Sequence, residues 1–417
     1  MTGTTINQLA QSTETTPTVV LSYGLGEDST AILLRWLEDP TSRDFDLDDL
    51  VVVTAMTGNE WESTRTTVET HVLPRLAAAG VRYIQAGRAR RHVTTAGDGV
   101  VILDDSRTPT RLYLEGEYSL WDEMVESGTI PQSGGARMCS VHSKGDVLDP
   151  VIAAVTRGDS YRHIIGYEAG EVRRATKDAL YNTALRTGEY PLIDWGWFRA
   201  DAIAYTETIT GFTIGKSACF YCPFAFANRD NRIEIFTRYK SEPAVGARTL
   251  LMEHLALALN PAQGLVGGKR LIDMITDEGM TDVLTAFENL LNEQQHALYE
   301  VRRILRPRKT DPTKLGNAAR SVRISTRGTR QLLQSTLDRF VVEGEAKGLV
   351  VGVKGDDNIM RLYERRRGAT FPAVERFFVV APALALEKES THFDQWWDDA
   401  LRSVEAAQIV GDLPIPA

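Results

Sequence analysis

Short apolar runs alternate with helix-periodic stretches along the first half of the chain. Runs rich in β-branched residues predict strands at residues 18–22, 50–55, 82–85 and 161–166. Apolar residues at helical spacing predict helices at residues 29–37, at about 61–79 and from about 171 onward. Strands that alternate with helices indicate the α/β class with a doubly wound parallel sheet, and we place this domain at residues 17–235.

The pattern changes after residue 235. Apolar spacing predicts helices at residues 250–259, 280–305 and 392–404, and one strand at 349–353. We therefore expect a mostly helical C-terminal region at residues 236–417, with no role that the sequence indicates. Residues 1–16 are rich in Thr, Ser and Gln, which predicts a disordered tail.

The composition is that of an ordinary globular protein. The chain has 417 residues, of which 43% are hydrophobic and 25% are charged. It has no run of about 18 uncharged apolar residues and no basic, apolar start, so we expect a cytoplasmic protein that does not associate with membranes. Three cysteines are too few, and odd in number, for a secreted disulfide scaffold. The isolated histidines His71, His163 and His254 are interpreted as structural.

A glycine-containing turn joins the first predicted strand to the first predicted helix. It reads Ser-Tyr-Gly-Leu-Gly-Glu-Asp-Ser-Thr over residues 22–30. Free backbone N–H groups and the helix dipole make such a helix start suitable for phosphate. The turn lacks the Gly-Lys-Ser/Thr ending of a Walker A loop and the spacing of a Rossmann fingerprint. The alternative is an ordinary tight turn in which Asp28 caps the helix.

This turn resembles the PP-loop of the adenine nucleotide α-hydrolase superfamily, whose usual form is S-F-S-G-G-K-D-S-T. The similar branch contains the phosphoadenylylsulfate (PAPS) reductase-like proteins and the DndC-like ATP pyrophosphatases of DNA phosphorothioation. The matching residues are Ser22, Gly26, Asp28, Ser29 and Thr30, while Gly24, Leu25 and Glu27 stand where the family has Ser, Gly and Lys. The resemblance implies that these residues and Gly24 bind ATP with Mg²⁺, and that Asp28 is catalytic.

Two further stretches resemble elements of the same family. Thr57, Gly58 and Glu60 match its T-G-x-E turn, and Gly166, Glu171 and Arg174 match its G-x-x-x-D-E-x-x-R element, with Gly170 in place of Asp. The resemblance implies that the first five bind the nucleotide and that Arg174 neutralises phosphate charge. The alternatives are a polar loop for the first stretch and a surface ion pair, three residues apart, for the second.

All three cysteines lie in motif-like settings. Cys219 and Cys222 form a C-x2-C pair, a spacing that suits a metal site. The first cysteine, Cys139, lies in a segment with Arg137, Ser140 and Lys144 that resembles the family's R-x-C-[TS]-x-x-x-K element. The resemblance implies that the three cysteines ligate a [4Fe–4S] cluster and that Lys144 is catalytic. A structural zinc site with His142 as the fourth ligand is the alternative.

The resemblance implies an ATP-dependent sulfurtransferase-like enzyme. It would cleave ATP to AMP and pyrophosphate and adenylate an acceptor, such as nucleic acid in DNA phosphorothioation, for sulfur insertion. A cysteine desulfurase is then the expected sulfur donor. One alternative is a PAPS reductase-like enzyme acting on adenylyl-sulfate, although no cysteine follows Cys222. The other is a zinc-stapled, non-catalytic nucleic-acid-binding component.

The charge is unevenly distributed. The segment from Arg302 to Arg330 contains ten basic residues and one acidic residue, a local charge of +9 in a chain of net charge −9. Such a segment predicts contact with nucleic-acid phosphates. The alternative is a solvated face that pairs with the acidic remainder of the chain.

Overall fold

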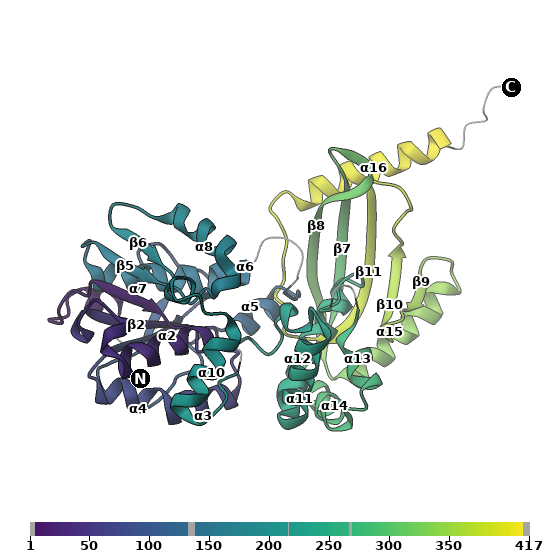
Figure 1. The fold of residues 1–417 in the computed structure, drawn as a ribbon. Helices are drawn as coiled ribbons and strands as arrows, with labels where there is room; N and C mark the ends of the chain where they lie inside the picture. The colour runs from purple at the N-terminus through teal and green to yellow at the C-terminus, as the bar shows by residue number, and fades with distance from the viewer. Residues whose placement is uncertain (1–4, 132–137, 216, 267–268, 412–417) are drawn as a thin grey trace. The chain divides into compact units, whose positions relative to one another are not determined.

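A computed structural model describes residues 5–131, 138–215, 217–266 and 269–411 (Figure 1). The chain divides into two compact units. Unit 1 comprises Met1–Glu123 and Gly134–Cys222, and unit 2 comprises Met124–Ser133 and Pro223–Ala417. The division therefore falls next to the C-x2-C pair, whereas the sequence places it at residue 235. Within the described residues, no helix combines the length and apolarity needed to cross a membrane.

The core of unit 1 is a six-stranded, mostly parallel sheet. Its strands are β1 (Val19–Ser22), β2 (Leu50–Met56), β3 (Arg82–Arg88), β4 (Val100–Ser106), β5 (Tyr161–Ile164) and β6 (Arg186–Glu189). Their order is β4-β3-β2-β1-β5-β6, and only the β3–β4 pair is antiparallel. The four predicted strands correspond to β1, β2, β3 and β5, which confirms the α/β class.

Helices cover both faces of this sheet because side chains of successive strand residues point in opposite directions. Val19 and Leu21 pack with Ile32 and Trp36 of α2, whereas Val20 packs with residues of α7. The helices of unit 1 are α1 (Ile6–Ala10), α2 (Glu27–Glu38), α3 (Glu62–His71), α4 (Leu73–Ala78), α5 (Leu120–Glu126), which continues into unit 2, α6 (Met138–Ser140), α7 (Asp146–Thr156), α8 (Val172–Asp178), α9 (Pro191–Asp194) and α10 (Arg199–Thr210).

The N-terminal segment differs from the predicted disordered tail. Residues 1–4 lie outside the described residues, but residues 6–10 form α1. Thr5 and Gln8 form a capping box that satisfies backbone donors at the start of the helix. Leu9 is buried and belongs to the same apolar cluster as α7. Ile6 packs against the same cluster, and Arg157 donates to the Ser12 and Glu14 carbonyls, so several contacts give the polar segment a defined position.

Unit 2 contains a five-stranded antiparallel sheet, although the sequence predicts a mostly helical region at residues 236–417. Its strands are β7 (His296–Arg308), β8 (Asp311–Gly328), β9 (Val351–Lys354), β10 (Met360–Arg365) and β11 (Ala373–Pro382), in the order β8-β7-β11-β10-β9. The helix predicted at 280–305 is wrong beyond residue 293, because α14 ends there and β7 begins at His296. Long-range pairing with β8 and β11 determines the conformation of β7, and this pairing is invisible to local periodicity.

Helices α11 (Arg229–Ser241), α12 (Pro243–Leu259), α13 (Leu271–Asp277), α14 (Thr281–Glu293), α15 (Arg330–Glu345) and α16 (Phe393–Gly411) complete unit 2. Three residues of α15 at a spacing of four, Leu333, Leu337 and Val341, form an apolar stripe that packs with residues of β7, β10 and β11. The long strands β7, β8 and β11 lie side by side, with α16 near one end of them (Figure 1).

A buried arginine ties the sheet of unit 2 to α12. Arg361 of β10 is 2% exposed and donates two hydrogen bonds to Asp357, with its Nη2 at 2.5 Å from the carboxylate Oδ2. The same Nη2 donates to the Leu257 carbonyl at 2.7 Å, and Nε donates to the Ala258 carbonyl at 3.3 Å. The guanidinium therefore satisfies carbonyls at the C-terminal end of α12, which have no partners within the helix.

We predict that Arg361→Met lowers the free energy of unfolding by about 3–5 kcal/mol, since it leaves the Asp357 carboxylate buried without its cation. Arg361→Lys keeps the charge but loses the forked donors, so its free energy of unfolding lies between those of Arg361→Met and the wild type. Arg339→Met is the matched control, because the Arg339 side chain is 64% exposed and only 3.9 Å from its nearest carboxylate partner, Glu343. Urea unfolding measures all three, and equal losses for Arg361→Met and Arg339→Met would contradict the assignment.

Candidate functional site

A cavity of about 320 Å³ in unit 1 collects most of the predicted nucleotide-binding residues. The predicted residues that line it are Ser22, Gly24, Gly26, Asp28, Ser29, Glu60, Lys144, Gly166, Glu171 and Arg174. They come from loops that follow β1, β2 and β5 and from the segment before α7. Because β2 and β5 flank β1 on opposite sides, the chain order reverses here, and open α/β sheets bind ligands at such a point.

The loop between β1 and α2 turns sharply at Leu25. This residue has φ of +64°, a left-handed conformation that glycine adopts without steric cost. Leu25 occupies the position where the resembling family has glycine, so the backbone keeps the glycine-type geometry despite the substitution. Its side chain is 3% exposed and belongs to the apolar core of unit 1, which offsets the backbone strain.

The start of α2 opens toward the cavity. Gly26 is the N-cap of α2, and the Gly24 N–H donates to the Ser29 hydroxyl at 3.1 Å. A Cβ on Gly166 would lie 3.1 Å from the Ser29 nitrogen, and one on Gly26 would lie 3.2 Å from the Ser217 nitrogen. A larger residue at either position would therefore require the opposing backbone to shift by a few tenths of an ångström.

Three predicted binding residues support the site without lining the cavity. The Thr30 side chain is fully buried and donates to the Gly26 carbonyl at 2.8 Å. Thr57 contacts the Cys219 sulfur through its hydroxyl at 3.4 Å. Gly58 has φ of +82°, and a Cβ there would lie 2.4 Å from the Ser119 Cβ. These residues shape the loops, so the prediction that each touches the nucleotide has no geometric support.

His163 orients the hydroxyl of Ser22. The Arg186 guanidinium donates to Nδ1 of His163 at 2.9 Å, so the proton of the neutral ring is on Nε2, which lies 2.8 Å from the Ser22 hydroxyl. Burial, and secondarily the charge of Arg186, lower the pKa of His163 to about 4. His163 is therefore structural, as predicted, and it acts directly on a residue that lines the cavity.

Asp28 lies deep in the site beside a residue that the motifs do not include. Its Oδ2 accepts from Arg199 at 3.2 Å, while its Oδ1 is buried with no hydrogen-bond partner among the described residues. Arg199 also pairs with Glu27 at 3.0 Å. Burial raises the pKa of Asp28, Arg199 opposes this shift, and the charges of Glu171 and Glu168 add to it. Arg199 begins α10, and no spacing pattern in the sequence links it to residue 28.

The cavity lining is electrostatically mixed. It has the cationic side chains Lys144, Arg174 and Arg199, and the acidic side chains Glu27, Asp28, Glu60 and Glu171. A polyphosphate in this cavity would meet more carboxylates than cations. An additional cation bound together with the phosphates would remove this repulsion.

Glu171 and Arg174 form the predicted ion pair and also line the cavity. The Arg174 guanidinium lies over the ring of Tyr167, 4.4 Å from its centroid, and Tyr167 stacks on Tyr190 at 5.7 Å. The Arg174 side chain is 55% exposed, so it can reorient at little cost. Tyr167 is a lining residue that the sequence motifs do not indicate.

The three cysteines lie in the same neighbourhood, next to the cavity. Burial raises the pKa of the Cys219 thiol to about 12, with further effects from the charges of Glu60, Lys144 and Cys222. Burial also raises the pKa of Cys139, and the charge of Cys222 adds to the shift. Glu60 and Lys144 line the cavity, so they connect the cysteines with it electrostatically. Arg137 of the same motif lies outside the described residues.

The described residues do not form a metal site around these cysteines. No group of three or more His, Cys, Asp or Glu side chains in the described ranges is placed to hold a metal ion. His142, the fourth ligand in the zinc alternative, instead contacts Glu123 through Nδ1 at 2.9 Å, and Glu123 also accepts from Arg88 at 2.6 Å. The iron–sulfur cluster and the zinc ion both remain predictions.

Half of the ten basic residues in the basic segment of unit 2 form ion pairs with acidic residues. Arg302 and Arg323 both contact Glu389, and Arg303 pairs with the buried Glu375 at 2.5 Å. Arg320 donates to the Ser127 and Gly128 carbonyls, and burial lowers its pKa to about 10. These contacts favour the alternative of internal charge pairing. The exposed basic residues are Arg306, Arg308, Lys309, Lys314 and Arg327.

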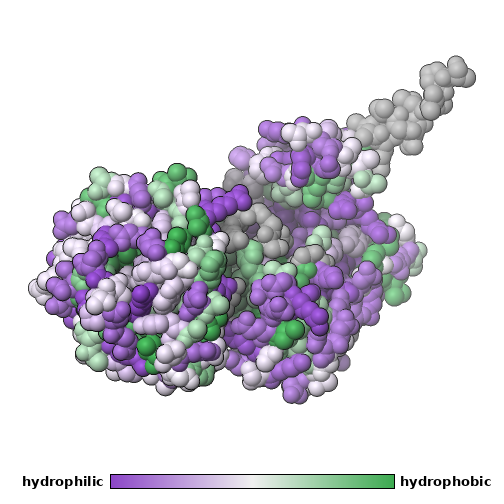
Figure 2. Space-filling view, viewed as in Figure 1, coloured by the Kyte–Doolittle hydropathy of each residue, from purple (hydrophilic) through white to green (hydrophobic). Residues whose placement is uncertain are grey.

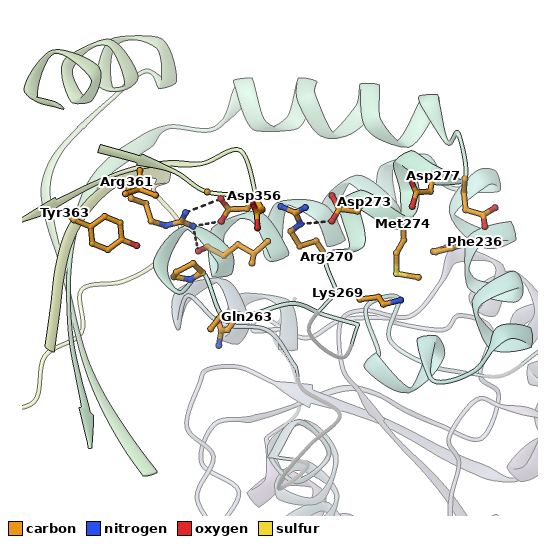
Figure 3. A pocket seen from close by; sticks show the side chains of 17 residues that line it. Phe236, Gln263, Lys269, Arg270, Asp273, Met274, Asp277, Asp356, Arg361 and Tyr363 are labelled. Carbon is orange, nitrogen blue, oxygen red and sulfur yellow. Dashed lines mark hydrogen bonds and ion pairs between the residues drawn. The ribbon is translucent and has the colours of Figure 1, made fainter. Parts of the chain in front are cut away.

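A larger cavity, of about 840 Å³, lies in unit 2 (Figure 3). Four of its eight charged lining residues are engaged in pairs with one another. Arg361 bonds Asp357, and Arg270 bonds Asp273 at 2.6 Å. The surface view in Figure 2 shows hydrophilic and hydrophobic residues interspersed. The unit 1 cavity is therefore the stronger candidate for chemistry, because it holds a buried carboxylate oxygen without a partner.

No protein-family model, curated protein or solved structure matches the chain. A functional assignment must therefore come from the side chains that line the cavity and from their geometry.

We predict that Leu25→Gly is less destabilising than Leu25→Ala by about 1 kcal/mol, since glycine removes the cost of the left-handed backbone. Both variants lose the buried side chain, which costs about 2–5 kcal/mol for Leu→Ala. Leu33, buried within α2, is the control, because there glycine is worse than alanine by about 1 kcal/mol. Urea unfolding of the glycine and alanine variants at Leu25 and Leu33 tests whether the order of stability reverses between the two positions. The same order at both positions would contradict the prediction.

We predict that His163 makes the stability of unit 1 depend on pH. The unfolded chain binds a proton near pH 6.5, while the folded protein resists protonation until about pH 4. The contribution of the neutral His163 ring to the free energy of unfolding is therefore fully present above pH 6.5 and is lost as the pH falls toward 4. Its magnitude is about 3 kcal/mol. His163→Gln should flatten the dependence in urea unfolding measured across this range. The exposed His92→Gln is the control, and an unchanged slope in His163→Gln would refute the role.

Proposed function

We propose that unit 1 is a doubly wound nucleotide-binding domain that binds ATP with Mg²⁺ and cleaves it between the α- and β-phosphates. An oxygen of the acceptor attacks the α-phosphorus, the bond from the α-phosphorus to the bridging oxygen breaks, and pyrophosphate leaves. The acceptor then carries AMP. This is the ATP pyrophosphatase activity of the PP-loop family that the sequence resembles.

The convergence of separate motifs carries this proposal. One cavity is lined by residues from four separate stretches: the glycine turn, the 57–60 turn, the 166–174 element and the segment around Lys144. These residues lie up to about 150 positions apart in the sequence. An accidental resemblance at four places would not require the four places to meet. The meeting point lies at the carboxyl ends of the strands, where open α/β sheets hold ligands.

The buried acid at the start of α2 supports Mg²⁺ as the accompanying cation. Asp28 offers a buried oxygen without a hydrogen-bond partner among the described residues, and Mg²⁺ prefers such carboxylate oxygens. We propose that Asp28, with Glu60 or Glu171 nearby in the lining, holds this ion. Bound Mg²⁺ would neutralise phosphate charge that the acidic lining otherwise repels.

The cationic side chains have separate roles in this proposal. Lys144 and Arg174 neutralise charge that develops on the phosphates as pyrophosphate leaves. Arg199 holds Asp28 and Glu27 in position, since it contacts both carboxylates. The Ser22 hydroxyl, oriented by His163, and the N–H groups at the start of α2 are the neutral donors.

The sulfur chemistry is not part of this proposal. A [4Fe–4S] cluster on Cys139, Cys219 and Cys222, a cysteine desulfurase partner and a nucleic-acid acceptor remain predictions from the resemblance. The arrangement of the described residues around the cysteines supports neither cluster nor zinc. The reductase-like alternative would use the same cavity for an adenylyl-sulfate, so the products formed from ATP distinguish it.

We predict that the full chain binds ATP in a Mg²⁺-dependent manner and, with water as the attacking acceptor when no other is supplied, releases AMP and pyrophosphate. Asp28→Asn keeps the shape of the side chain but removes the charge that holds the cation, so it weakens MgATP binding about tenfold or more. Titration calorimetry with and without Mg²⁺ measures binding, which needs no acceptor. Chromatography of the nucleotides after incubation identifies the products.

Asp48→Asn is the matched control, because Asp48 is an exposed acid whose side chain is 92% accessible. It should leave both measurements unchanged. Formation of ADP and phosphate would replace the proposed reaction with γ-phosphate cleavage. Failure to bind MgATP, or equal binding by Asp28→Asn and the wild type, would refute the proposed nucleotide site.

A further inference from the structure

Unit 2 contains a second, smaller cavity with a different chemistry. It has a volume of about 460 Å³. Its charged or titratable lining residues are His254, His296, Arg330, Asp338 and Lys354, and its other lining residues are Gln334, Asn358, Ile359, Met360 and Val380. The residues come from α12, β7, α15, β9, β10 and β11. Several elements of one unit therefore build it, and its volume is that of a small-molecule site.

A buried imidazole in this cavity has an unused acceptor. His296 is 1% exposed, and its Nδ1 lies 3.0 Å from the Gln294 carbonyl. A carbonyl only accepts, so Nδ1 carries the proton and Nε2 is the acceptor of the neutral ring. Nε2 is buried and has no hydrogen-bond partner among the described residues. Buried polar atoms are nearly always paired, so this nitrogen is suited to accept a hydrogen bond from the O–H or N–H group of a ligand.

Cations dominate the charged lining. Arg330 uses one terminal nitrogen, Nη1, for its contacts with Glu288 and Asn292. Lys354 has no ion pair among the described residues. The acid in the lining, Asp338, is exposed and accepts from Gln334 at 2.9 Å. The cavity therefore favours an anion over a metal ion.

The second histidine of the lining, His254, is uncharged. Burial lowers the pKa of His254 to about 4, and the charges of Arg330 and His296 contribute. His254 is therefore neutral at physiological pH, and its ring packs edge-on against Phe287 at 6.0 Å between centroids. Two neutral rings beside two cations provide hydrogen bonding as well as charge.

We propose that this cavity binds a small oxyanion that also carries an O–H donor, such as inorganic phosphate or a phosphate monoester whose organic part bears a hydroxyl group. Lys354 and Arg330 attract the anionic oxygens, and His296 accepts the donor through Nε2. The site is separate from the nucleotide site of unit 1 and does not depend on the function proposed for it.

Phosphate and sulfate provide a direct test, because both are tetrahedral oxyanions but at neutral pH only phosphate carries an O–H. Titration calorimetry of the full chain should show phosphate binding at least about tenfold more tightly than sulfate. Ribose 5-phosphate tests whether a monoester with hydroxyl groups binds more tightly than inorganic phosphate. Equal affinity for phosphate and sulfate, or no binding of either ion, would overturn the proposal.

Variants assign the binding to this cavity. Lys354→Gln should weaken phosphate binding about fivefold or more, while Lys347→Gln, an exposed lysine outside the lining, should not. His296→Phe keeps a ring but removes the acceptor, so it should abolish the preference for phosphate over sulfate. If His296→Phe does not fold, Lys354→Gln still decides, because the side chain it replaces is exposed. Binding that is insensitive to Lys354→Gln would place the ion elsewhere and refute the site.

Discussion

The left-handed turn at Leu25 is the constraint on which the candidate site of unit 1 depends. It lets the chain leave β1 and enter α2 within a few residues, so that the first turn of α2 faces the cavity. A leucine there carries a backbone cost of about 1–2 kcal/mol, and burial of its side chain contributes a comparable or larger stabilisation. The side chain that strains the turn therefore also anchors it in the core.

The same turn explains why a buried acid without full hydrogen bonding is tolerated. Asp28 is fixed in the first turn of α2, where the helix dipole favours negative charge, and Arg199 compensates part of the burial. One oxygen has no hydrogen-bond partner within the described part of the chain, which is rare for a purely structural carboxylate. The contacts of Asp28 compensate the burial of its carboxylate only in part. In this it differs from Glu123, whose carboxylate both Arg88 and His142 contact.

The sequence predicts the parts of this molecule that depend on local pattern. Strands β1, β2 and β5 are short apolar runs, and the lining residues Asp28, Glu60 and Glu171 lie in contiguous motifs. Arg199 was missed because only the folded chain brings it to the cavity, whereas Tyr167 lies beside Gly166 at a position where the motif specifies no residue type. Strand β7 was missed because its partners, β8 and β11, lie up to about 80 residues away and determine its conformation. Likewise, the basic segment alone predicts a positively charged face. Only the folded chain shows which acids pair with it, such as Glu375 and Glu389.

Charge pairing also separates the two cavities that remain candidates for ligands. In unit 1, the acids of the lining outnumber the cations, so an anionic ligand needs an accompanying cation. In unit 2, the smaller cavity has two cations, two neutral imidazoles and a single exposed acid, so an anion needs no such partner. In each case the decisive atom is a buried acceptor to which no described residue donates: Oδ1 of Asp28 in one and Nε2 of His296 in the other. A carboxylate oxygen beside other acids suits a hard cation, whereas an imidazole nitrogen beside cations suits a proton donor on an anion.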